Sequence, residues 1–449
     1  MSKDNILNLY LNGIPYGGSI YGVEEASQNF FGIKASELTL TQSAYLAALP
    51  QAPTYYSPYG KNKNKLEDRK NLVLKEMLAN NFINKDEYNS AMKEKVVWRL
   101  QNDTGIKAPH FVQFVIDYLE KKYGADVLQN GGLKVITTLD YNLQKQAESI
   151  LKNGATKNEK TFNASNAALV AIDPKTGQIL SMVGSRNYFD TKIDGNFNVA
   201  IAHRQPGSSF KPFAYAEAFN KGYTPDTILF DVQTEFSSEC TPDGFPKNRA
   251  NDPKICYMPV NYEGTFQGPI TMKAALAESI NIPAIKTFYL SGMSDVLKLA
   301  KDMGVTLGDL NQYGLTLVLG GGEVSLLDMT SAYSVFANEG VRNPYVSILE
   351  IKDKNEKILE SFQPNPKTVL PKETTEKISD ILSDDVARTP LYGAHSLLYI
   401  PGRDVAVKTG TTNDYRDAWI IGYTPDITVG MWAGNNDNTP MEKKISGLI

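Results

Sequence analysis

Residues 168–172 and 178–183 read Ala-Leu-Val-Ala-Ile and Gln-Ile-Leu-Ser-Met-Val, joined by Asp-Pro-Lys-Thr-Gly at 173–177. Two apolar runs of strand length with a Pro- and Gly-containing segment between them are typical of a β-hairpin. Three further short apolar runs lie close together near the end of the chain, at 405–409, 418–423 and 427–432. Because the intervening region is mainly helical in pattern, we predict an α/β (α+β) domain with a central antiparallel sheet covered by helices.

The first part of the chain has a helical pattern. Residues 36–49 consist largely of strong helix formers and are followed by prolines, and the charged segment 61–75 resumes the helical pattern. Residues 111–122 also favour helix, whereas residues 133–139 favour a strand. The polar run 153–166 then indicates a domain boundary.

The overall composition is that of an ordinary globular protein. The chain has 449 residues, 42% of them hydrophobic and 21% charged, and a formal net charge of −4. This balance gives no basic surface for nucleic acid, and no nucleic-acid partner is expected. No uninterrupted apolar run approaches the roughly 18 to 20 residues that cross a bilayer, and Met1–Asp4 lacks the pattern of a secretion signal.

Histidines and cysteines are few. His110, His203 and His395 occur singly, which supplies neither a zinc site nor a Ser-His-Asp triad, and we expect no metal or cofactor. Cys240 and Cys256 lie in one polar insertion. They can pair in an oxidising compartment, but their spacing alone leaves the pairing open.

Three short motifs carry the chemistry: Ser208-Ser-Phe-Lys211, Ser279-Ile-Asn281 and Lys408-Thr-Gly-Thr411. Each motif alone occurs by chance in many proteins, as a solvated helix surface or an ordinary turn. Together and in this order they are typical of serine β-lactamases and penicillin-binding proteins.

The first motif predicts a nucleophile with its base. Ser208 follows Pro206-Gly207 and begins a predicted helix, in which Pro212 is tolerated because it falls in the first turn. The i,i+3 spacing brings the Lys211 amine toward the Ser208 hydroxyl. A lysine whose pKa is depressed can take the hydroxyl proton, and the Ser208 amide is free to bind an oxyanion.

The second motif is expected in a loop, because Pro283 disfavours helix at Ile282. From there we expect Ser279 to relay a proton to the leaving amine. Asn281 holds the substrate backbone.

The third motif is expected on a strand, where Lys408 and Gly410 share a face opposite Thr409. Lys408 supplies positive charge for a substrate carboxylate, and Gly410 leaves room for an extended peptide. The Thr411 amide is the expected second oxyanion donor. With Asn281, residues Lys408, Thr409, Gly410 and Thr411 form the predicted substrate-binding set.

Longer blocks around these motifs resemble the transpeptidase domain of class A (bifunctional) penicillin-binding proteins. The similar blocks are 205–212, 275–284, 320–328 and 408–419. The glycines at 320–322 are not followed by Gly-Lys-Ser/Thr, so a structural turn is expected there instead of a phosphate loop.

The N-terminal part is similar to the late portion of the glycosyltransferase domain of that family, at 3–12 and 69–74. The two earlier family motifs that carry the acid/base glutamates do not occur. The resemblance therefore implies a sequence truncated at its start, with a membrane anchor upstream, and a similarly shortened C-terminus. It implies action at the extracytoplasmic face of the bacterial membrane.

The resemblance implies three domains: the C-terminal part of a glycosyltransferase at 1–80, a linker module at 81–165 and a penicillin-binding transpeptidase at 166–449. It also implies a serine-type D-Ala-D-Ala transpeptidase that cross-links peptidoglycan stem peptides and is acylated by β-lactams. Lipid-linked glycan precursor is a partner of the full-length family. Without the two glutamates, glycosyl transfer by this chain is not expected.

Two alternatives stay open. In a β-lactamase or D,D-carboxypeptidase, water takes the acyl group; no Glu-x-x-Leu-Asn segment of the kind used for deacylation occurs here. In a penicillin sensor or wall-binding scaffold, the serine is acylated without cross-linking, although the glycosyltransferase-like segment argues against a sensor.

Overall fold

The computed structural model describes residues 1–449 except 18–19, 54, 61, 100–105, 249, 251, 309–312 and 443–449. The predicted C-terminal limit at residue 449 therefore lies outside the described residues. The chain divides into two units, Met1–Lys107 with Phe189–Asp194, and Ala108–Tyr188 with Gly195–Ile449.

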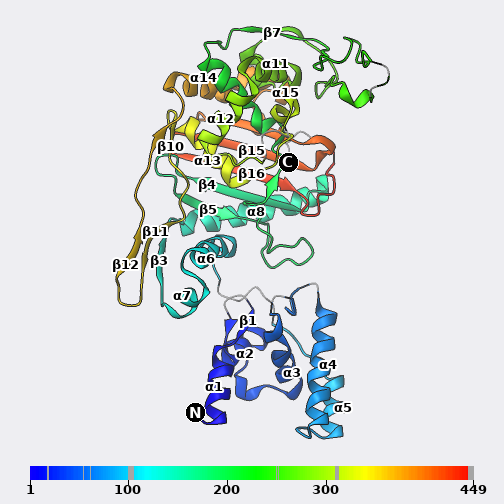
Figure 1. Ribbon diagram of the computed structural model, residues 1–449, viewed down its shortest axis with the longest axis vertical. Coiled ribbons are helices and arrows are strands. Elements are labelled where there is room, and N and C mark those ends of the chain that lie inside the picture. Colours follow the sequence, from blue (N-terminus) through cyan, green and yellow to red (C-terminus); the bar gives the residue numbers. More distant parts are fainter. Residues whose placement is uncertain are drawn as a thin grey trace. The chain divides into compact units, whose positions relative to one another are not determined.

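The N-terminal unit is mainly helical, as the sequence predicts. Thr39 caps one helix, α3, reciprocally with Gln42, which explains where the run of helix formers becomes a helix. Its core includes Phe30, Tyr45 and Leu66. The elements are α1 (Lys3–Gly13), β1 (Pro15–Gly17), β2 (Ile20–Tyr21), α2 (Val23–Phe31), η1 (Ala35–Glu37), α3 (Leu40–Ala48), η2 (Leu49–Gln51), α4 (Lys63–Ala79) and α5 (Lys85–Lys93) (Figure 1).

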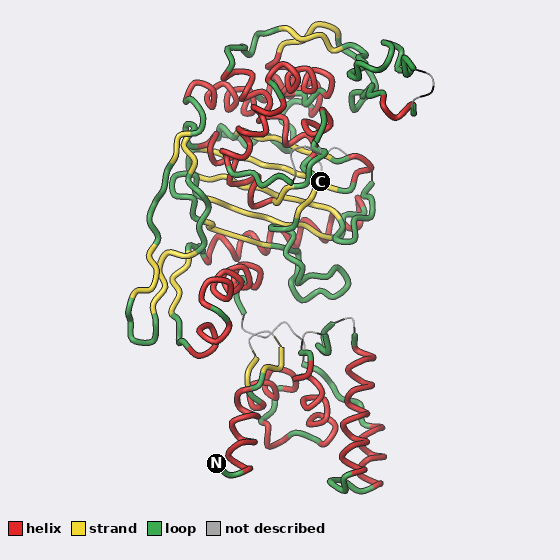
Figure 2. Tube along the Cα trace, in the orientation of Figure 1, coloured by secondary structure: helices red, strands yellow, loops and turns green. Residues whose placement is uncertain are grey.

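A five-stranded sheet forms the centre of the C-terminal unit (Figures 1 and 2). The predicted hairpin is present: β4 (Asn166–Ile172) and β5 (Ile179–Val183) pair antiparallel. The strands predicted near the end of the chain are β14 (Ala406–Thr411), β15 (Asp417–Thr424) and β16 (Ile427–Gly434). The order is β14-β15-β16-β4-β5, and every neighbouring pair is antiparallel. The predicted fold class is thereby confirmed.

Helices cover both faces of this sheet, which explains why β4 is buried along its whole length. On one face, Leu151 of α8 (Tyr141–Phe162) packs with Leu169 of β4. On the other, Phe213 of α9 (Lys211–Asn220) and Tyr333 of α13 (Leu326–Ala337) lie in the main core. α9 begins at Lys211 of the first motif, and Ser208 lies in the turn η4 (Gly207–Phe210) directly before it, so this motif is built onto the core.

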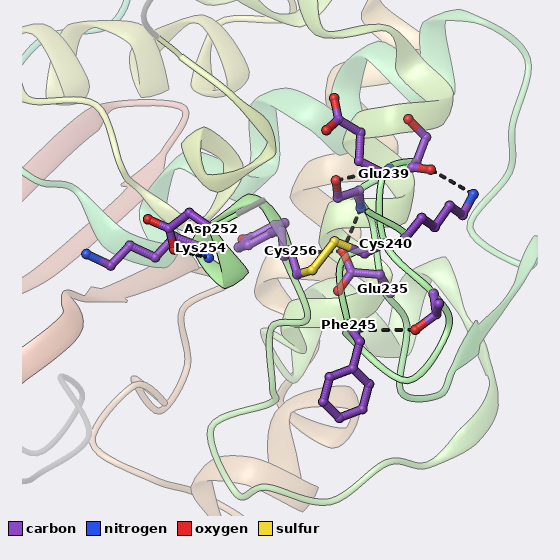
Figure 3. Close-up of a disulfide and its surroundings, with 12 residues drawn as sticks. Glu235, Glu239, Cys240, Phe245, Asp252, Lys254 and Cys256 are labelled. Carbon is purple, nitrogen blue, oxygen red and sulfur yellow. Dashed lines mark hydrogen bonds between the residues drawn. A yellow bond between two sulfur atoms is a disulfide. The ribbon is translucent and has the colours of Figure 1, made fainter. Parts of the chain in front are cut away.

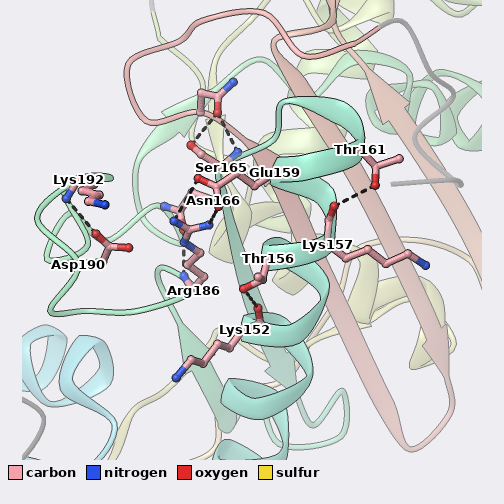
Figure 4. Close-up of polar contacts among 11 residues, drawn as sticks. Lys152, Thr156, Lys157, Glu159, Thr161, Ser165, Asn166, Arg186, Asp190 and Lys192 are labelled. Atoms are coloured by element: carbon pink, nitrogen blue, oxygen red, sulfur yellow. Dashed lines mark hydrogen bonds and ion pairs between the residues drawn. The ribbon is translucent and has the colours of Figure 1, made fainter.

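The polar run that marked a predicted boundary lies largely inside α8. Its charged residues occupy the solvent side; for example, Glu159 forms an ion pair of 2.5 Å with Arg186 (Figure 4). Ala147, Leu151 and Ala155 face the sheet. The polarity of this run therefore reflects the exposed face of a helix, and α8 belongs to the same unit as the sheet.

The remaining elements of the C-terminal unit surround this centre. Among the helices that the structure describes, none has the length and apolar character needed to cross a membrane. The elements are α6 (Pro109–Tyr123), α7 (Ala125–Asn130), β3 (Lys134–Thr137), β6 (His203–Arg204), η4 (Gly207–Phe210), β7 (Ile228–Asp231), η5 (Pro253–Ile255), β8 (Gly268–Thr271), α10 (Met272–Ala277), α11 (Asn281–Ser291), α12 (Met293–Met303), η7 (Leu315–Leu319), β9 (Val324–Ser325), β10 (Val341–Arg342), β11 (Ile348–Lys352), β12 (Ile358–Ser361), β13 (Lys367–Thr368), α14 (Lys372–Ser383), α15 (Asp385–Tyr392) and η8 (Asn413–Tyr415).

Candidate active site

The first motif forms the start of a helix, as predicted. Ser208 lies in the 3₁₀ turn η4, which continues directly into α9 at Lys211. Phe210 and Phe213 are fully buried and their rings pack 5.1 Å apart, which anchors the turn in the core. Pro212 lies in the first turn of α9, where it displaces no intrahelical hydrogen bond.

Three glycines let the backbone close in around Ser208. Gly207 has φ +56°, and a Cβ there would lie 2.4 Å from the Thr411 carbonyl oxygen. A Cβ on Gly410 would lie 2.1 Å from the Pro206 carbonyl oxygen. The missing side chain of Gly410 therefore admits the turn that carries Ser208, whereas the sequence pattern predicted that this space is left for the substrate. Gly320, at φ +87°, packs against Gly207, so the glycine run is a structural turn as predicted.

The second motif spans the end of one helix and the start of the next. The amides of Ser279 and Ile280 donate to the carbonyls of Leu276 and Ala275, which is the hydrogen-bond pattern of a Schellman motif ending α10. Ser279 occupies its left-handed position, with φ +58°, where glycine is usual.

Asn281 is the first residue of α11, so the prediction that the whole motif lies in a loop is wrong for this residue. Pro283 falls in the first helical turn, where proline is tolerated, and did not exclude helix at Ile282.

The buried Lys211 ammonium faces the second motif. Its Nζ donates to the Ser279 carbonyl at 2.5 Å and to Asn281 Oδ1 at 2.8 Å. Lys408 Nζ donates to Ser279 Oγ at 2.8 Å. Within the described part of the chain no hydrogen bond joins Ser208 Oγ to Lys211 Nζ, so that predicted contact is not made in this state. The Ser279 hydroxyl thus lies between the two lysines.

The environment of the two lysines lowers the pKa of both. Burial holds the pKa of Lys211 well below its usual value, and the neighbouring Lys408 charge lowers it further. Burial also lowers the pKa of Lys408, to about 7. A neutral Lys211 amine is able to accept a proton, which a fully charged lysine is not.

The motifs line one cavity of about 630 Å³. Ser208, Ser279, Asn281, Thr409 and Thr411 all contribute to its wall. The other predicted site residues, Lys211, Lys408 and Gly410, are not among the lining residues; both lysines reach Ser279 from their buried positions.

Two polar residues at this cavity lie outside the sequence motifs. The Tyr392 hydroxyl, at the end of α15, lies 2.6 Å from Thr409 Oγ1. Asn261 lines the cavity and is largely buried. Neither residue belongs to a recognisable spacing, so sequence patterns gave no signal for them.

The two cysteines form a disulfide, which settles the pairing that the sequence left open. Cys240 and Cys256 have Cα atoms 5.7 Å apart, in the long excursion between β7 and β8 (Figure 3). The Glu235 carboxylate lies beside them and accepts hydrogen bonds from the amides of Ser237 and Tyr257, both at 2.7 Å. These contacts close the excursion on itself.

Known families match both parts of the chain. The family model described as Penicillin binding protein transpeptidase domain matches residues 167–447, and the one described as Transglycosylase matches residues 1–78. The fold and the match together define a penicillin-binding transpeptidase domain that follows glycosyltransferase-like sequence.

Individual relatives agree with this. Penicillin-binding protein 1A of Aquifex aeolicus is 31% identical over 99% of this chain and 69% of its own length. Penicillin-binding protein 2D of Bacillus subtilis is 32% identical over 98% of this chain, which spans 62% of that relative. The chain belongs to the class A, bifunctional penicillin-binding proteins.

Solved structures have the same fold. Penicillin-binding protein 1A of Haemophilus influenzae superimposes with a TM-score of 0.63 at 24% identity, covering 99% of this chain and 82% of that one. PonA1 of Mycobacterium tuberculosis, solved in complex with penicillin V, gives 0.59 at 26% identity, covering 76% and 88%.

Proposed function

We propose that this chain is a peptidoglycan D,D-transpeptidase that works through an acyl-serine intermediate and is acylated by penicillin. One observation carries the proposal: a helix start, a helix junction and a strand bring Ser208, Ser279 and Thr411 to one cavity, with Lys211 buried beside Ser279. Membership of the penicillin-binding transpeptidase family supports the same chemistry.

In the proposed first step, Ser208 Oγ attacks the carbonyl carbon of the penultimate D-alanine in a stem peptide. The hydroxyl proton passes to Lys211, and the amides of Ser208 and Thr411 stabilise the oxyanion. The peptide C–N bond then breaks. Ser279 passes the proton from Lys211 to the departing D-alanine, which leaves an ester on Ser208.

In the second step, the amine of a neighbouring stem attacks this ester. Its proton returns through Lys211 to the Ser208 oxygen as the new amide bond forms. Asn281 and Thr409 bind the peptide backbone, and Lys408 supplies positive charge for the terminal carboxylate of the donor. No metal or cofactor enters these steps.

The location of the reaction belongs to the same proposal. We place it at the extracytoplasmic face of a bacterial membrane, and a disulfide is compatible with an oxidising compartment. We assign residues 1–80 to the glycosyltransferase portion, 81–165 to a linker module and 166–449 to the transpeptidase. Glycan polymerisation from lipid-linked precursor is not proposed for this chain, because the two glutamate motifs are missing from its sequence.

The proposal is tested with a stem peptide ending in D-Ala-D-Ala and an excess of an acceptor peptide. Mass spectrometry should detect released D-alanine together with an equal amount of cross-linked product, and Ser208→Ala should form neither. Release of D-alanine without cross-linked product would indicate a carboxypeptidase. Acylation by penicillin with neither product would favour a sensor or scaffold, and turnover of penicillin would favour a β-lactamase.

A further inference from the structure

A buried polar pair closes the base of the excursion that carries the disulfide. The excursion leaves β7 at Asp231, which is fully buried, and returns at Asn261, which is also buried. The Asn261 side chain donates from Nδ2 to Asp231 Oδ1 at 2.8 Å and to Oδ2 at 3.0 Å. A third contact runs from the same nitrogen to the Thr265 carbonyl at 2.8 Å.

The opposite end of the same amide binds the start of α11. Asn261 Oδ1 accepts from the backbone amides of Asn281 and Ile282, both at 3.1 Å. With carboxylate oxygens on one side and two N–H groups on the other, the orientation of the Asn261 amide is fixed by its partners.

The first turn of α11 depends on this external cap. The amides that open a helix have no intrahelical partner. Ile280, at the N-cap position, has no side chain that could accept from them. Pro283 has no N–H, so Asn261 satisfies both of the amides that the first three residues of α11 present.

This cap bears directly on the catalytic lysine. Asn281 donates from Nδ2 to the carbonyl of Val260, the residue before Asn261, at 3.0 Å. That contact directs Asn281 Oδ1 to Lys211 Nζ, 2.8 Å away. The backbone and the side chain of Asn281 are therefore both held by the segment that ends the excursion.

We infer that Asn261 is a positioning residue for acyl transfer: by joining Asp231 to the first turn of α11, it holds Asn281 and Ser279 in register with Lys211. The inference rests on the proposed function of Ser208 and Lys211. It assigns to the excursion between β7 and β8 the role of fixing the second motif from outside that motif.

The decisive variant is Asn261→Asp, which keeps the shape and the oxygen that caps α11. It also places an oxygen against the Asp231 carboxylate and the Thr265 carbonyl, so the contacts of residue 261 with Asp231 and Thr265 become repulsive. The exchanged pair Asp231→Asn/Asn261→Asp restores one N–H···O contact in the opposite direction at unchanged net charge. The Thr265 carbonyl then lacks its donor and faces an oxygen, as in Asn261→Asp, and the Gln267 amide, which donates to Asp231 Oδ2, keeps an acceptor in the side-chain oxygen of the exchanged asparagine.

Asn343→Asp is the matched control. Asn343 is also buried and donates from Nδ2 to the carbonyls of Pro174 and Lys175, both at 3.0 Å, but it does not line the cavity. The substitution therefore makes the same amide-to-carboxylate change at a buried asparagine whose hydrogen-bond partners lie outside the three motifs.

The measurement is the acylation of each full-length variant by a fluorescent penicillin, resolved into the affinity of the initial complex and the acylation rate constant. For Asn261→Asp we expect that rate constant to fall by about ten- to a hundred-fold, with the affinity within about two-fold. The exchanged pair should recover to within about five-fold of wild type, and Asn343→Asp should stay within about two-fold.

A wild-type rate in folded Asn261→Asp would overturn the inference, as would an equal loss in Asn343→Asp. If Asn261→Asp does not fold, the test rests on the exchanged pair. A folded exchanged pair whose acylation rate constant is as low as that of Ser279→Ala would contradict positioning by the Asn261 contacts. Absence of acylation in the wild-type protein would overturn the proposed function, and the inference with it.

Discussion

The nucleophile turn at 207–211 and the second motif at 279–281 bring hydroxyl groups to the same cavity by different means. The first is a regular helix start, with Phe210 buried in the core and glycine at the one position of positive φ. The second holds Ser279 at φ +58° and takes its cap from Asn261, 20 residues earlier. The first arrangement is encoded locally, whereas the second depends on distant contacts and on a backbone conformation that serine disfavours.

The difference explains where strain is tolerated. A Schellman motif favours glycine at its left-handed position, yet glycine has no hydroxyl to place between Lys211 and Lys408. Ser279 therefore keeps a chemically useful group at a conformational cost. The surrounding contacts, from both lysines and the cap on α11, hold that conformation.

The largest effect is expected on replacing Lys211, the proposed general base. Lys211→Met keeps the length and most of the packing of a fully buried side chain but removes the proton acceptor. We expect the penicillin acylation rate constant to fall by about a thousand-fold, since general bases contribute roughly 10² to 10⁴. Stopped-flow fluorescence measures it, with thermal unfolding as the control for folding. A loss smaller than about ten-fold would place the base elsewhere.

Gly410→Ala tests whether the nucleophile turn depends on its contact with β14. The added Cβ meets the Pro206 carbonyl, so we expect a loss of about 1–3 kcal/mol in the free energy of unfolding and a ten- to hundred-fold slower acylation, about as for other overpacked sites. Gly154→Ala is the matched control. No atom lies within 4 Å of a Cβ at that position in α8, and the substitution should stabilise the protein by about 0.5–1 kcal/mol. Equal changes in the free energy of unfolding and in the acylation rate of the two variants would contradict close packing of Gly410 against the turn that carries Ser208.

The pH dependence of acylation tests the electrostatic coupling between the two regions. Burial and the Lys408 charge both lower the pKa of Lys211. Lys408→Met removes a like charge, which should raise the pKa of Lys211. The acidic limb of the pH profile of the acylation rate constant should therefore move to higher pH. Lys408→Arg keeps the charge and should leave the limb at or below its wild-type position. A limb that does not move in Lys408→Met would exclude this coupling.

The strain at Ser279 gives the smallest expected effect, seen in stability. Ser279→Ala and Ser279→Gly both lack the hydroxyl, but only glycine adopts φ +58° without a steric cost. Ser279→Gly should therefore be more stable than Ser279→Ala by about 1 kcal/mol, by denaturant unfolding. Equal stability would show that the left-handed residue stores no strain.

The sequence predicted the parts of the fold and site whose pattern is local. The hairpin at 168–183 and the three late strands follow from apolar runs and turn residues, and the motifs follow from short spacings. The role of Asn261 could not be predicted, because its partners Asp231 and Asn281 are distant in the chain and meet only after folding.

The prediction that the whole second motif lies in a loop failed for a physical reason that is visible in the fold. Pro283 suggested a loop through Asn281, but a proline in the first turn fits the helix.

The assignment of Ser208 as the nucleophile is tested by incubating the protein with penicillin and locating the adduct by peptide mass mapping. We expect a stable, stoichiometric adduct on Ser208 that is lost in Ser208→Ala. An adduct on another residue, or none on protein shown to be folded, would contradict the assignment of Ser208 as the nucleophile.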